Sequence, residues 1–318
     1  MMEWTDRHWR RFARTLTKHA LLYTEMVTAK ALIHGNLDHL TAHSPEEYPL
    51  ALQIGGAKPE ELFQAVTRTR ALGFCEINLN LGCPSDRVQS GAFGAALMKH
   101  PSQVAECLDA MSQASGMTGP EITAKIRLGV DDDDVNHTLP RFLDMLNGSP
   151  IQRVIIHARK ALLDGLSPKQ NREIPPLDYG LVHQMKKQFD SMQIILNGGI
   201  ESVEHGLVAA DGLDGFMLGR AAYQRPHTLL QIDPLVFGQA PPHKAARDAL
   251  LAYRPYVESV LAAGFPLKHV TRHLVGLYHD VPGARQFRRI LSERAHQRDA
   301  DWSVIADALN AIQDTEQA

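Results

Sequence analysis

Short apolar runs, each ending in a glycine or a polar residue, recur along the first two thirds of the chain with helix-like stretches between them. Their length and composition are typical of buried parallel strands. The seven runs are ALLYTEM (20–26), PLALQIGG (49–56), FCEINLNLG (74–82), EITAKIRLG (121–129), RVIIHA (153–158), QIILNGGI (193–200) and GFMLGRA (215–221). Because parallel strands need long crossover connections, this repetition predicts an α/β protein built on a parallel sheet.

The stretches between the runs have apolar residues at helical spacing, as in residues 58–72 and 101–115. Polar residues or glycines at every strand's carboxyl end favour a (β/α)8 TIM barrel with its site on that face. A doubly wound sheet is the weaker alternative, because it would have a GxGxxG turn after its first strand. A closed barrel needs eight strands. We expect the missing one to be the first and to lie upstream of residue 1, because Met1–Asp6 resembles a strand-end loop that leads into a helix over Arg7–Leu16.

The pattern changes after Gly238, where GQAPPHKAARD resembles a linker. We therefore expect a barrel domain over residues 1–237 and a small helical bundle over residues 244–318. Four helices are expected in the bundle, at 250–263, 268–280, 284–295 and 302–313.

Composition limits the compartment and the partners. The cysteines Cys75, Cys83 and Cys107 cannot all pair and lack CxxC spacing, which indicates a reducing compartment and no zinc site. No apolar run approaches a membrane span and the start lacks a secretory signal, so we expect a cytoplasmic protein with no membrane association and no obligate protein partner. The net charge of −3 identifies no partner. Residues 268–298, however, hold a local excess of Lys and Arg that suits a phosphate backbone.

Four polar residues stand at or near the ends of apolar strands, where a barrel would bring them to one mouth. They are Gln53, Asn80, Lys125 and His157. A single Gln or His in such a place could equally satisfy nearby backbone groups, whereas a buried lysine needs a partner for its charge. The four together favour a site.

The last two strands end in Asn197-Gly198-Gly199 and in Gly219-Arg220. Glycines there let backbone N–H groups approach an anion, and the loops after the last two barrel strands are the usual phosphate site. Either motif alone could be a tight turn, but together they favour a ligand that carries a phosphate. Lys125 would then lie near an electron-rich part of that ligand and could stabilise a reduced, anionic cofactor.

Several long motifs resemble the A subfamily of tRNA-dihydrouridine synthases. They are MMEWTDRH, LLYTEMVT, ALQIGG, EINLNLGCPSDRVQSGAFGAALM, KIRLG, IIHARKALLDGLSPKQNREIPPLDY, ILNGGI, GRAAYQRP and, in the tail, GARQFRRILSE. The resemblance implies an FMN-containing barrel and a helical domain that binds tRNA. It also implies that NADPH, or NADH in its place, drives reduction of D-loop uridines, with positions 20 and 20a expected.

The resemblance also implies roles for individual residues. The implied FMN contacts are Gln53, Lys125, His157, Asn197, Gly198, Gly199, Gly219 and Arg220. Cys83 is implied as the proton donor and Asn80 as a contact to the uracil. Lys169, Arg172, Arg285 and Arg288 are the implied tRNA contacts. The family begins with a strand that ends in Ala-Pro-Met and lies against the flavin, whereas this sequence has only Met1-Met2 there.

The implied chemistry explains why a thiol stands in the loop after a strand. Reduction of the uracil C5–C6 double bond needs hydride at C6 and a proton at C5, and a thiol of ordinary pKa is still protonated at neutral pH. One alternative is a flavin barrel for a free pyrimidine, similar to a dihydroorotate dehydrogenase. Another is a non-catalytic tRNA-binding module, and a more distant one is a Schiff-base aldolase using Lys125. For the arginines at 285–289 the alternative is a solvated helix face.

Overall fold

The computed structural model describes residues 1–85 and 93–312 of the chain. The chain forms two compact units. The sheet unit comprises Leu21–Ser44 and Tyr48–Leu218, and the helical unit comprises Met1–Ala20, Pro45–Glu47 and Gly219–Ala318. The domain boundary expected between residues 237 and 244 stays a prediction.

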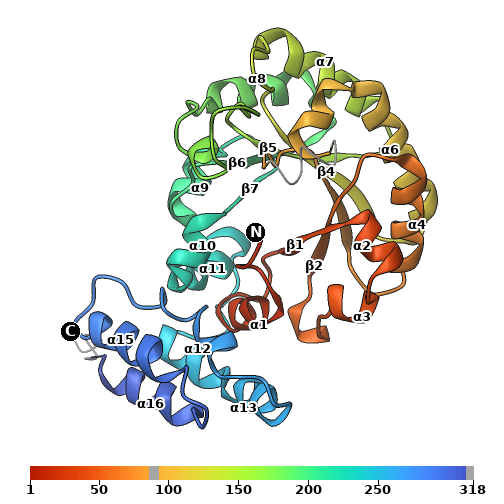
Figure 1. Cartoon of the computed structure of the whole chain (residues 1–318). Coiled ribbons are helices and arrows are strands. Elements are labelled where there is room, and N and C mark those ends of the chain that lie inside the picture. The colour runs from red at the N-terminus through yellow and green to blue at the C-terminus, as the bar shows by residue number, and fades with distance from the viewer. Residues whose placement is uncertain (86–92, 313–318) are drawn as a thin grey trace. The chain divides into compact units, whose positions relative to one another are not determined.

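The sheet unit is built on seven parallel strands that pair in sequence order (Figure 1). Their bounds are β1 Leu22–Thr28, β2 Leu50–Gly55, β3 Glu76–Asn80, β4 Glu121–Arg127, β5 Arg153–His157, β6 Gln193–Asn197 and β7 Gly215–Met217. All seven expected strands are thereby confirmed. Within the described residues, β1 and β7 are the edges of the sheet and neither pairs with a further strand.

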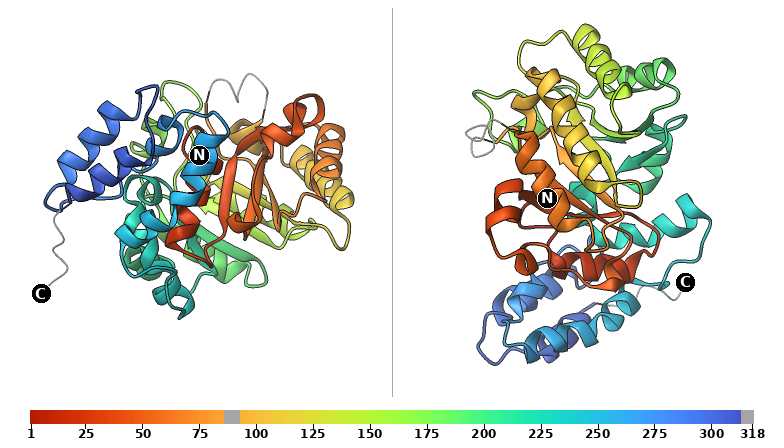
Figure 2. Two further views of the ribbon diagram at one scale, coloured as in Figure 1. Left: turned by 90° about the horizontal axis from the view of Figure 1, so that it is seen from below. Right: turned by 90° about the vertical axis from the view of Figure 1, so that its right-hand side faces the viewer.

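Helices connect the successive strands and lie on the outer face of the sheet (Figures 1 and 2). They are α2 Ala29–His34, α3 Leu37–Leu40, α4 Pro59–Thr69, α6 Pro101–Ser115, α7 Val135–Asn147, α8 Tyr179–Gln188 and α9 Val203–Ala209. Two 3-10 segments, η2 Gly94–Lys99 and η3 Gln170–Arg172, lie in the loops. A parallel sheet with helices outside and strands in chain order is the arrangement of a TIM barrel, so the expected fold class is confirmed.

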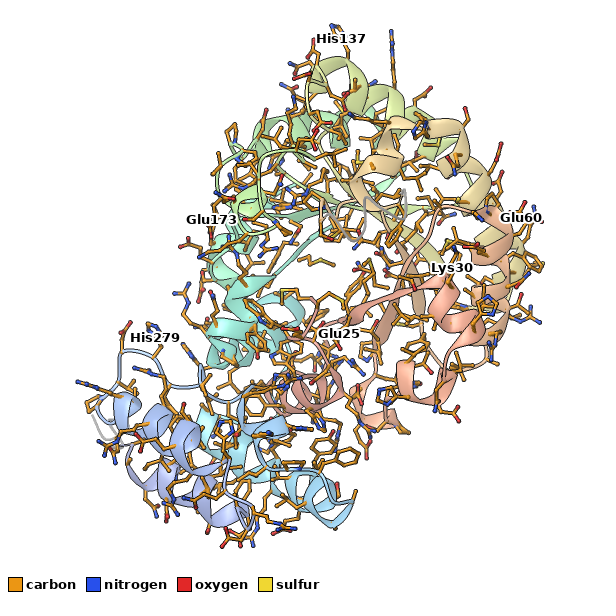
Figure 3. The ribbon with its side chains drawn as sticks, viewed as in Figure 1. Glu25, Lys30, Glu60, His137, Glu173 and His279 are labelled. Carbon is orange, nitrogen blue, oxygen red and sulfur yellow. The ribbon has the colours of Figure 1, made fainter. Side chains whose placement is uncertain are left out.

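The two faces of the strands differ in chemistry. Residues such as Leu52, Ile77 and Leu79 point outward and are fully buried under the helices. The alternate positions of β3 point inward and are polar, namely Glu76, Asn78 and Asn80. On the far side of the helices, polar side chains such as those of Glu60 and His137 point away from the sheet (Figure 3). The core between sheet and helices is therefore apolar, whereas the inside of the sheet carries polar groups.

The helical unit begins with α1 Arg7–Leu16, the helix expected at those residues. Asp6 caps it by accepting a hydrogen bond from the Trp9 amide at 3.0 Å. The unit also contains the 3-10 segments η1 Pro45–Glu47 and η4 Pro226–Gln231. Its remaining helices are α10 Arg220–Gln224, α11 Ile232–Phe237, α12 Ala246–Ala252, α13 Arg254–Ala262, α14 Lys268–Thr271, α15 Ala284–Arg294 and α16 Trp302–Asn310.

The expected four-helix tail is wrong in two places. The stretch 250–263 is split into α12 and α13 at Tyr253, because Pro255 has no N–H to continue the first helix. The stretch 268–280 is helical only over α14, and turns follow. Gly276, in those turns, lies so close to Gln224 that a Cβ would be 2.3 Å from its carbonyl oxygen. Close backbone packing, which sequence periodicity does not report, therefore replaces a longer helix.

Across the described residues, none of the helices combines the length and the apolar character that crossing a membrane requires.

Candidate active site

The carboxyl ends of β2 to β6 bring together five of the residues expected from the sequence. These are Gln53, Asn80, Lys125, His157 and Asn197. Parallel register sets Asn80 beside Lys125 and His157 beside Asn197. Because the carboxyl ends of parallel strands share one edge of the sheet, these side chains form a single polar cluster.

Lys125 has an ammonium group without a hydrogen-bond partner among the described residues. The pKa of Lys125 is lowered to about 7, mainly by burial and then by the charge of Arg127, while the neighbouring Cys83 acts in the opposite direction. An isolated cation inside a protein is costly, so this amine would gain its charge most readily when an anionic or electron-rich group lies against it. The position fits the edge of a bound ligand.

His157 is buried, with 7% of its surface exposed. Its pKa lies well below the ordinary value, first because of burial and then because of the charges of Arg127, Lys125, Arg159 and Arg172. The ring is therefore neutral at pH 7, with one nitrogen able to donate and the other able to accept. Neither nitrogen bonds to another described side chain or backbone group, which leaves both for a ligand.

The turn after β6 requires glycine at two successive positions. Gly198 has φ +108° and Gly199 has φ +67°, values that residues with a side chain rarely adopt. A Cβ on Gly198 would lie 2.3 Å from Cδ2 of His157, and one on Gly199 would lie 2.5 Å from Cδ1 of Leu177. Asn197 ties this turn to the next strand by donating from Nδ2 to the Met217 carbonyl at 2.8 Å. The side chains of His157 and Leu177 thus already occupy the space that a Cβ would take at either position.

Gly219 and Arg220 belong to the helical unit, whereas the strand-end cluster belongs to the sheet unit. Gly219 precedes α10 at its amino end, and no atom lies within 4 Å of where its Cβ would be. The space beside this glycine is open, as the sequence-based phosphate site requires.

The loop after β3 holds Cys83 in a defined backbone conformation. Oδ1 of Asn80 accepts hydrogen bonds from the amides of Gly82 at 3.1 Å and Cys83 at 3.0 Å. The half-buried Sγ of Cys83 lies 3.4 Å from Oγ of Ser85. Asn80 was expected only as a uracil contact. In the structure its carbonyl oxygen organises the loop of the thiol, and one of its amide hydrogens remains for a ligand.

The other two cysteines lie elsewhere in the sheet unit, and all three are free thiols. Burial raises the pKa of Cys107 to about 12, with the charges of Glu106 and Glu60 adding to the effect. Burial likewise raises the pKa of Cys75. Of the three, Cys83 alone stands beside Lys125 and Arg127.

Arg127 is a residue of this region that sequence reasoning missed. Its side chain is buried, and burial lowers its pKa to about 10. Nε donates to the Gly82 carbonyl at 3.1 Å, and Nη1 donates to the carbonyls of Lys160 at 3.2 Å and Asn171 at 3.0 Å. One guanidinium thus joins the Cys83 loop to the loop after β5. Its position two residues after Lys125 on the same strand face was the available signal.

The loop after β5 carries two of the expected tRNA contacts. Asn171 is fully buried and anchors this loop, exchanging hydrogen bonds with the backbone of Leu162 at 2.8 Å in both directions. Lys169 is exposed, whereas Arg172 is half-buried and its charge acts on His157. The buried asparagine fixes a loop that presents a lysine to solvent and an arginine toward the cluster.

The other two expected tRNA contacts, Arg285 and Arg288, lie on α15 of the helical unit. Both are exposed, and their spacing of three residues places them on one helix face. Arg288 also donates to the Tyr278 carbonyl at 3.2 Å.

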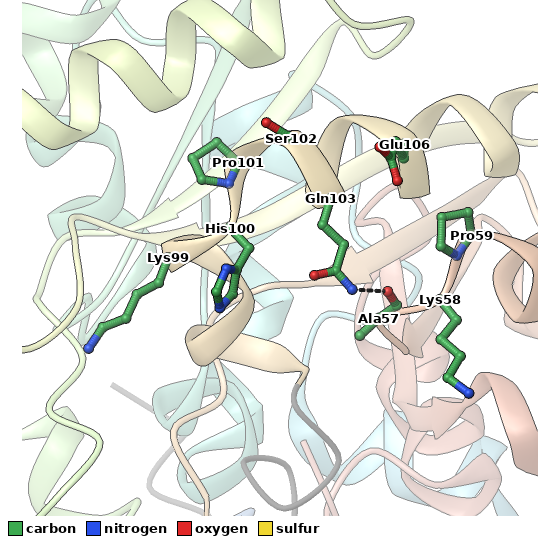
Figure 4. A pocket seen from close by; sticks show the side chains of 9 residues that line it. All are labelled: Ala57, Lys58, Pro59, Lys99, His100, Pro101, Ser102, Gln103 and Glu106. Atoms are coloured by element: carbon green, nitrogen blue, oxygen red, sulfur yellow. Dashed lines mark hydrogen bonds between the residues drawn. The ribbon is translucent and has the colours of Figure 1, made fainter.

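A separate, shallow depression of about 590 Å³ lies where α4 and α6 begin (Figure 4). Its lining includes Lys58, Lys99 and His100, and Gln103 closes one side by donating to the Ala57 carbonyl at 2.7 Å. None of the strand-end residues lines it. The depression is therefore distinct from the strand-end cluster.

Comparisons with known proteins identify the family of the chain. The chain matches the family described as dihydrouridine synthase over residues 1–315. It is 48% identical to the tRNA-dihydrouridine(20/20a) synthase of Xanthomonas campestris pv. campestris, covering 99% of this chain and 92% of that protein. It is 47% identical to the protein of the same name from Escherichia coli K12, covering 99% and 90%.

Among solved structures, morphinone reductase is similar with a TM-score of 0.50 and 11% identity, over 78% of this chain and 85% of that one. At that identity the likeness concerns the fold alone. The family match spans nearly the whole chain, and the chain belongs to the dihydrouridine synthase family.

Proposed function

We propose that this protein reduces uridine to 5,6-dihydrouridine in the D loop of tRNA, at positions 20 and 20a, using FMN and NADPH. The observation that carries the proposal is the loop of Cys83, held by Asn80 beside the amine of Lys125, which has no hydrogen-bond partner among the described residues, in a chain of the dihydrouridine synthase family. The names of the two relatives above state the same substrate and positions for those proteins.

The residues at the carboxyl edge fit FMN. The Gly198-Gly199 turn has no side chains of its own to keep an anion away from its backbone N–H groups, and Lys125 and His157 have polar atoms without partners among the described residues. Gln53, Asn197, Gly219 and Arg220 complete the set that we assign to the cofactor. FMN held by these residues would supply the hydride that C6 of the uracil requires, with NADPH as the source of its electrons. Lys125 would carry its proton and stabilise negative charge on the ring system.

Cys83 would act as the general acid. Its S–H bond breaks as the proton moves to C5 of the uracil, and the resulting thiolate lies near the positive charges of Lys125 and Arg127. Asn80 would hold the thiol's backbone and offer its remaining amide hydrogen to the base. The target base must leave its stack, at a cost of a few kcal/mol that contacts to the tRNA can offset. We assign those contacts to Lys169, Arg172, Arg285 and Arg288.

A reconstituted reaction tests the proposal directly. Purified protein with FMN and NADPH is given an unmodified tRNA transcript or free uridine, and the products are identified by mass spectrometry after nuclease digestion. We expect dihydrouridine at positions 20 and 20a of the transcript and little reaction of free uridine. Equal turnover of free uridine would instead support a pyrimidine reductase. Tight tRNA binding without bound flavin or product would support a non-catalytic module.

A cytoplasmic location remains a prediction.

A further inference from the structure

A row of five polar side chains crosses the inside of the sheet and ends at the Cys83 loop. We call it the polar file, and its members are Glu76, Thr123, Asn78, Gln53 and Asn80. The first three are almost completely buried, with 1%, 0% and 0% of their surfaces exposed. Register explains the arrangement, because Gln53 pairs with Asn78 and Asn78 pairs with Thr123 on neighbouring parallel strands. Their side chains therefore lie next to one another on the inner face.

Hydrogen bonds join the file without a break. Thr123 Oγ1 donates to Glu76 Oε1 at 2.6 Å, and Asn78 Nδ2 donates to Thr123 Oγ1 at 2.8 Å. Gln53 Nε2 donates to Asn78 Oδ1 at 3.0 Å, and Asn80 Nδ2 donates to Gln53 Oε1 at 2.9 Å. The amides of Gly82 and Cys83 donate to Asn80 Oδ1 and complete the file.

Every bond in the file points the same way, and the two ends determine that direction. A backbone N–H can only donate, so Asn80 must present its oxygen to the Cys83 loop and its nitrogen to Gln53. Gln53 must then accept from Asn80 and donate to Asn78. For the same reason Asn78 must donate to the hydroxyl of Thr123, which donates onward to Glu76. At the far end Glu76 forms an ion pair with Arg153 at 3.1 Å, and its carboxylate can only accept. Each amide therefore has one orientation that satisfies both neighbours.

We propose that Thr123 and Asn78 are positioning residues, which act through the polar file to set the amide orientation of Asn80 and hence the conformation of the Cys83 loop. Turning any one amide around would place two donors, or two acceptors, against each other inside the sheet, where water does not compensate for them. Aligned hydrogen bonds also polarise one another, so a carboxylate at one end strengthens acceptance at the other. The role in the reaction rests on the proposed function of Cys83, whereas the role in the loop does not.

Hydrogen exchange of individual amides tests the file without cofactor or tRNA. Thr123→Val removes the hydroxyl link at nearly constant volume, and Thr123→Ser restores it. The matched control is Thr69→Val, because Thr69 is also fully buried but bonds only within its own helix, to the Ala65 carbonyl at 2.8 Å. We expect the Gly82 and Cys83 amides to exchange about fivefold faster or more in Thr123→Val. Thr123→Ser should match the wild type, and amides of α6 should change less than about twofold.

The proposal is overturned if Thr123→Val accelerates exchange at Gly82 and Cys83 no more than Thr69→Val does. If Thr123→Val does not fold, hydrogen exchange of side-chain amides in the wild-type protein tests the proposal instead. One side-chain amide hydrogen of Asn78 and one of Asn80 should then exchange far more slowly than those of the exposed Gln286. Equal rates would refute the file.

With FMN bound, Thr123→Val should lower kcat for tRNA while KM and flavin reduction by NADPH are retained. If the wild type does not reduce tRNA at all, the proposed function is rejected. The exchange result would still test the role of the polar file in the Cys83 loop.

Discussion

The ring of His157 lies directly against the backbone of Gly198, with Cδ2 only 2.3 Å from where a Cβ of residue 198 would be. Two strand ends thus approach each other with no room for a methyl group. Burial and the surrounding cations keep the ring of His157 neutral, so the contact does not bury a further positive charge. The contact therefore requires glycine at position 198.

Gly198→Ala is therefore expected to destabilise the protein by about 2 kcal/mol or more, because it adds both a clash and an unfavourable φ. Gly180→Ala is the matched control. Gly180 lies in α8, and the nearest atom to its Cβ position would be Oδ1 of Asp178 at an ordinary 3.4 Å. That change should be neutral or stabilise by up to about 1 kcal/mol. Denaturant unfolding of both variants measures the difference, and equal stabilities would show that the turn has room.

Cys83→Ala should leave FMN binding and flavin reduction by NADPH close to wild type, because the proposed role of the thiol concerns only the step with tRNA. Reoxidation by tRNA should slow by about 10²- to 10⁴-fold, the usual contribution of a general acid. Cys83→Ser should recover little, because a hydroxyl is a much weaker acid than a thiol. Stopped-flow absorbance resolves the two half-reactions. If both slow equally, the thiol serves packing and another acid must be sought.

Riboflavin affinity should fall as the pH rises through about 7, the pKa of Lys125. A ligand that favours the charged amine raises that pKa on binding, so binding takes up a proton above pH 7 and weakens by up to about tenfold per pH unit. Riboflavin is used because the phosphate of FMN itself titrates near pH 6.

Lys125→Met should bind more weakly and without this pH dependence, whereas Lys125→Arg should retain affinity up to pH 9. Fluorescence quenching titrations from pH 6 to 9 measure both. The same pH dependence in wild type and Lys125→Met would exclude the lysine as the titrating group.

Replacing Arg285 and Arg288 together by Ala should weaken tRNA binding and lower its salt dependence. Each tRNA phosphate that an arginine no longer neutralises should reduce the slope of log K against log salt by about 0.7 to 0.9. A control with two exposed cations elsewhere, Arg141→Ala with Lys187→Ala on α7 and α8, should change the slope little. Filter binding across a salt series gives both slopes. If affinity is unchanged while flavin reduction suffers, these arginines serve the fold.

Local patterns in the sequence were enough to predict the strands and the polar residues that gather at their carboxyl ends. Each strand is a short apolar run, and burial against helices requires that composition wherever the strand lies in the sheet. The expected helix Arg7–Leu16 was confirmed because its signals, from the Asp6 cap to its apolar face, are all local. The helix expected over 268–280 in the tail was wrong, because the backbones of Gly276 and Gln224 approach each other closely and turns replace the rest of that helix.

The functional site was predicted only as a set of strand-end residues. Tertiary structure decided how they connect, because the partners come from different strands. Asn78 and Thr123 are 45 residues apart, yet they bond at 2.8 Å once the register of β3 and β4 is set. Arg127 likewise became a link between two loops only when folding brought the carbonyls of Gly82 and Asn171 to its guanidinium. Apolar burial is a property of each residue and is visible in a sequence, whereas a directed hydrogen bond belongs to a pair and exists only after the pair has met.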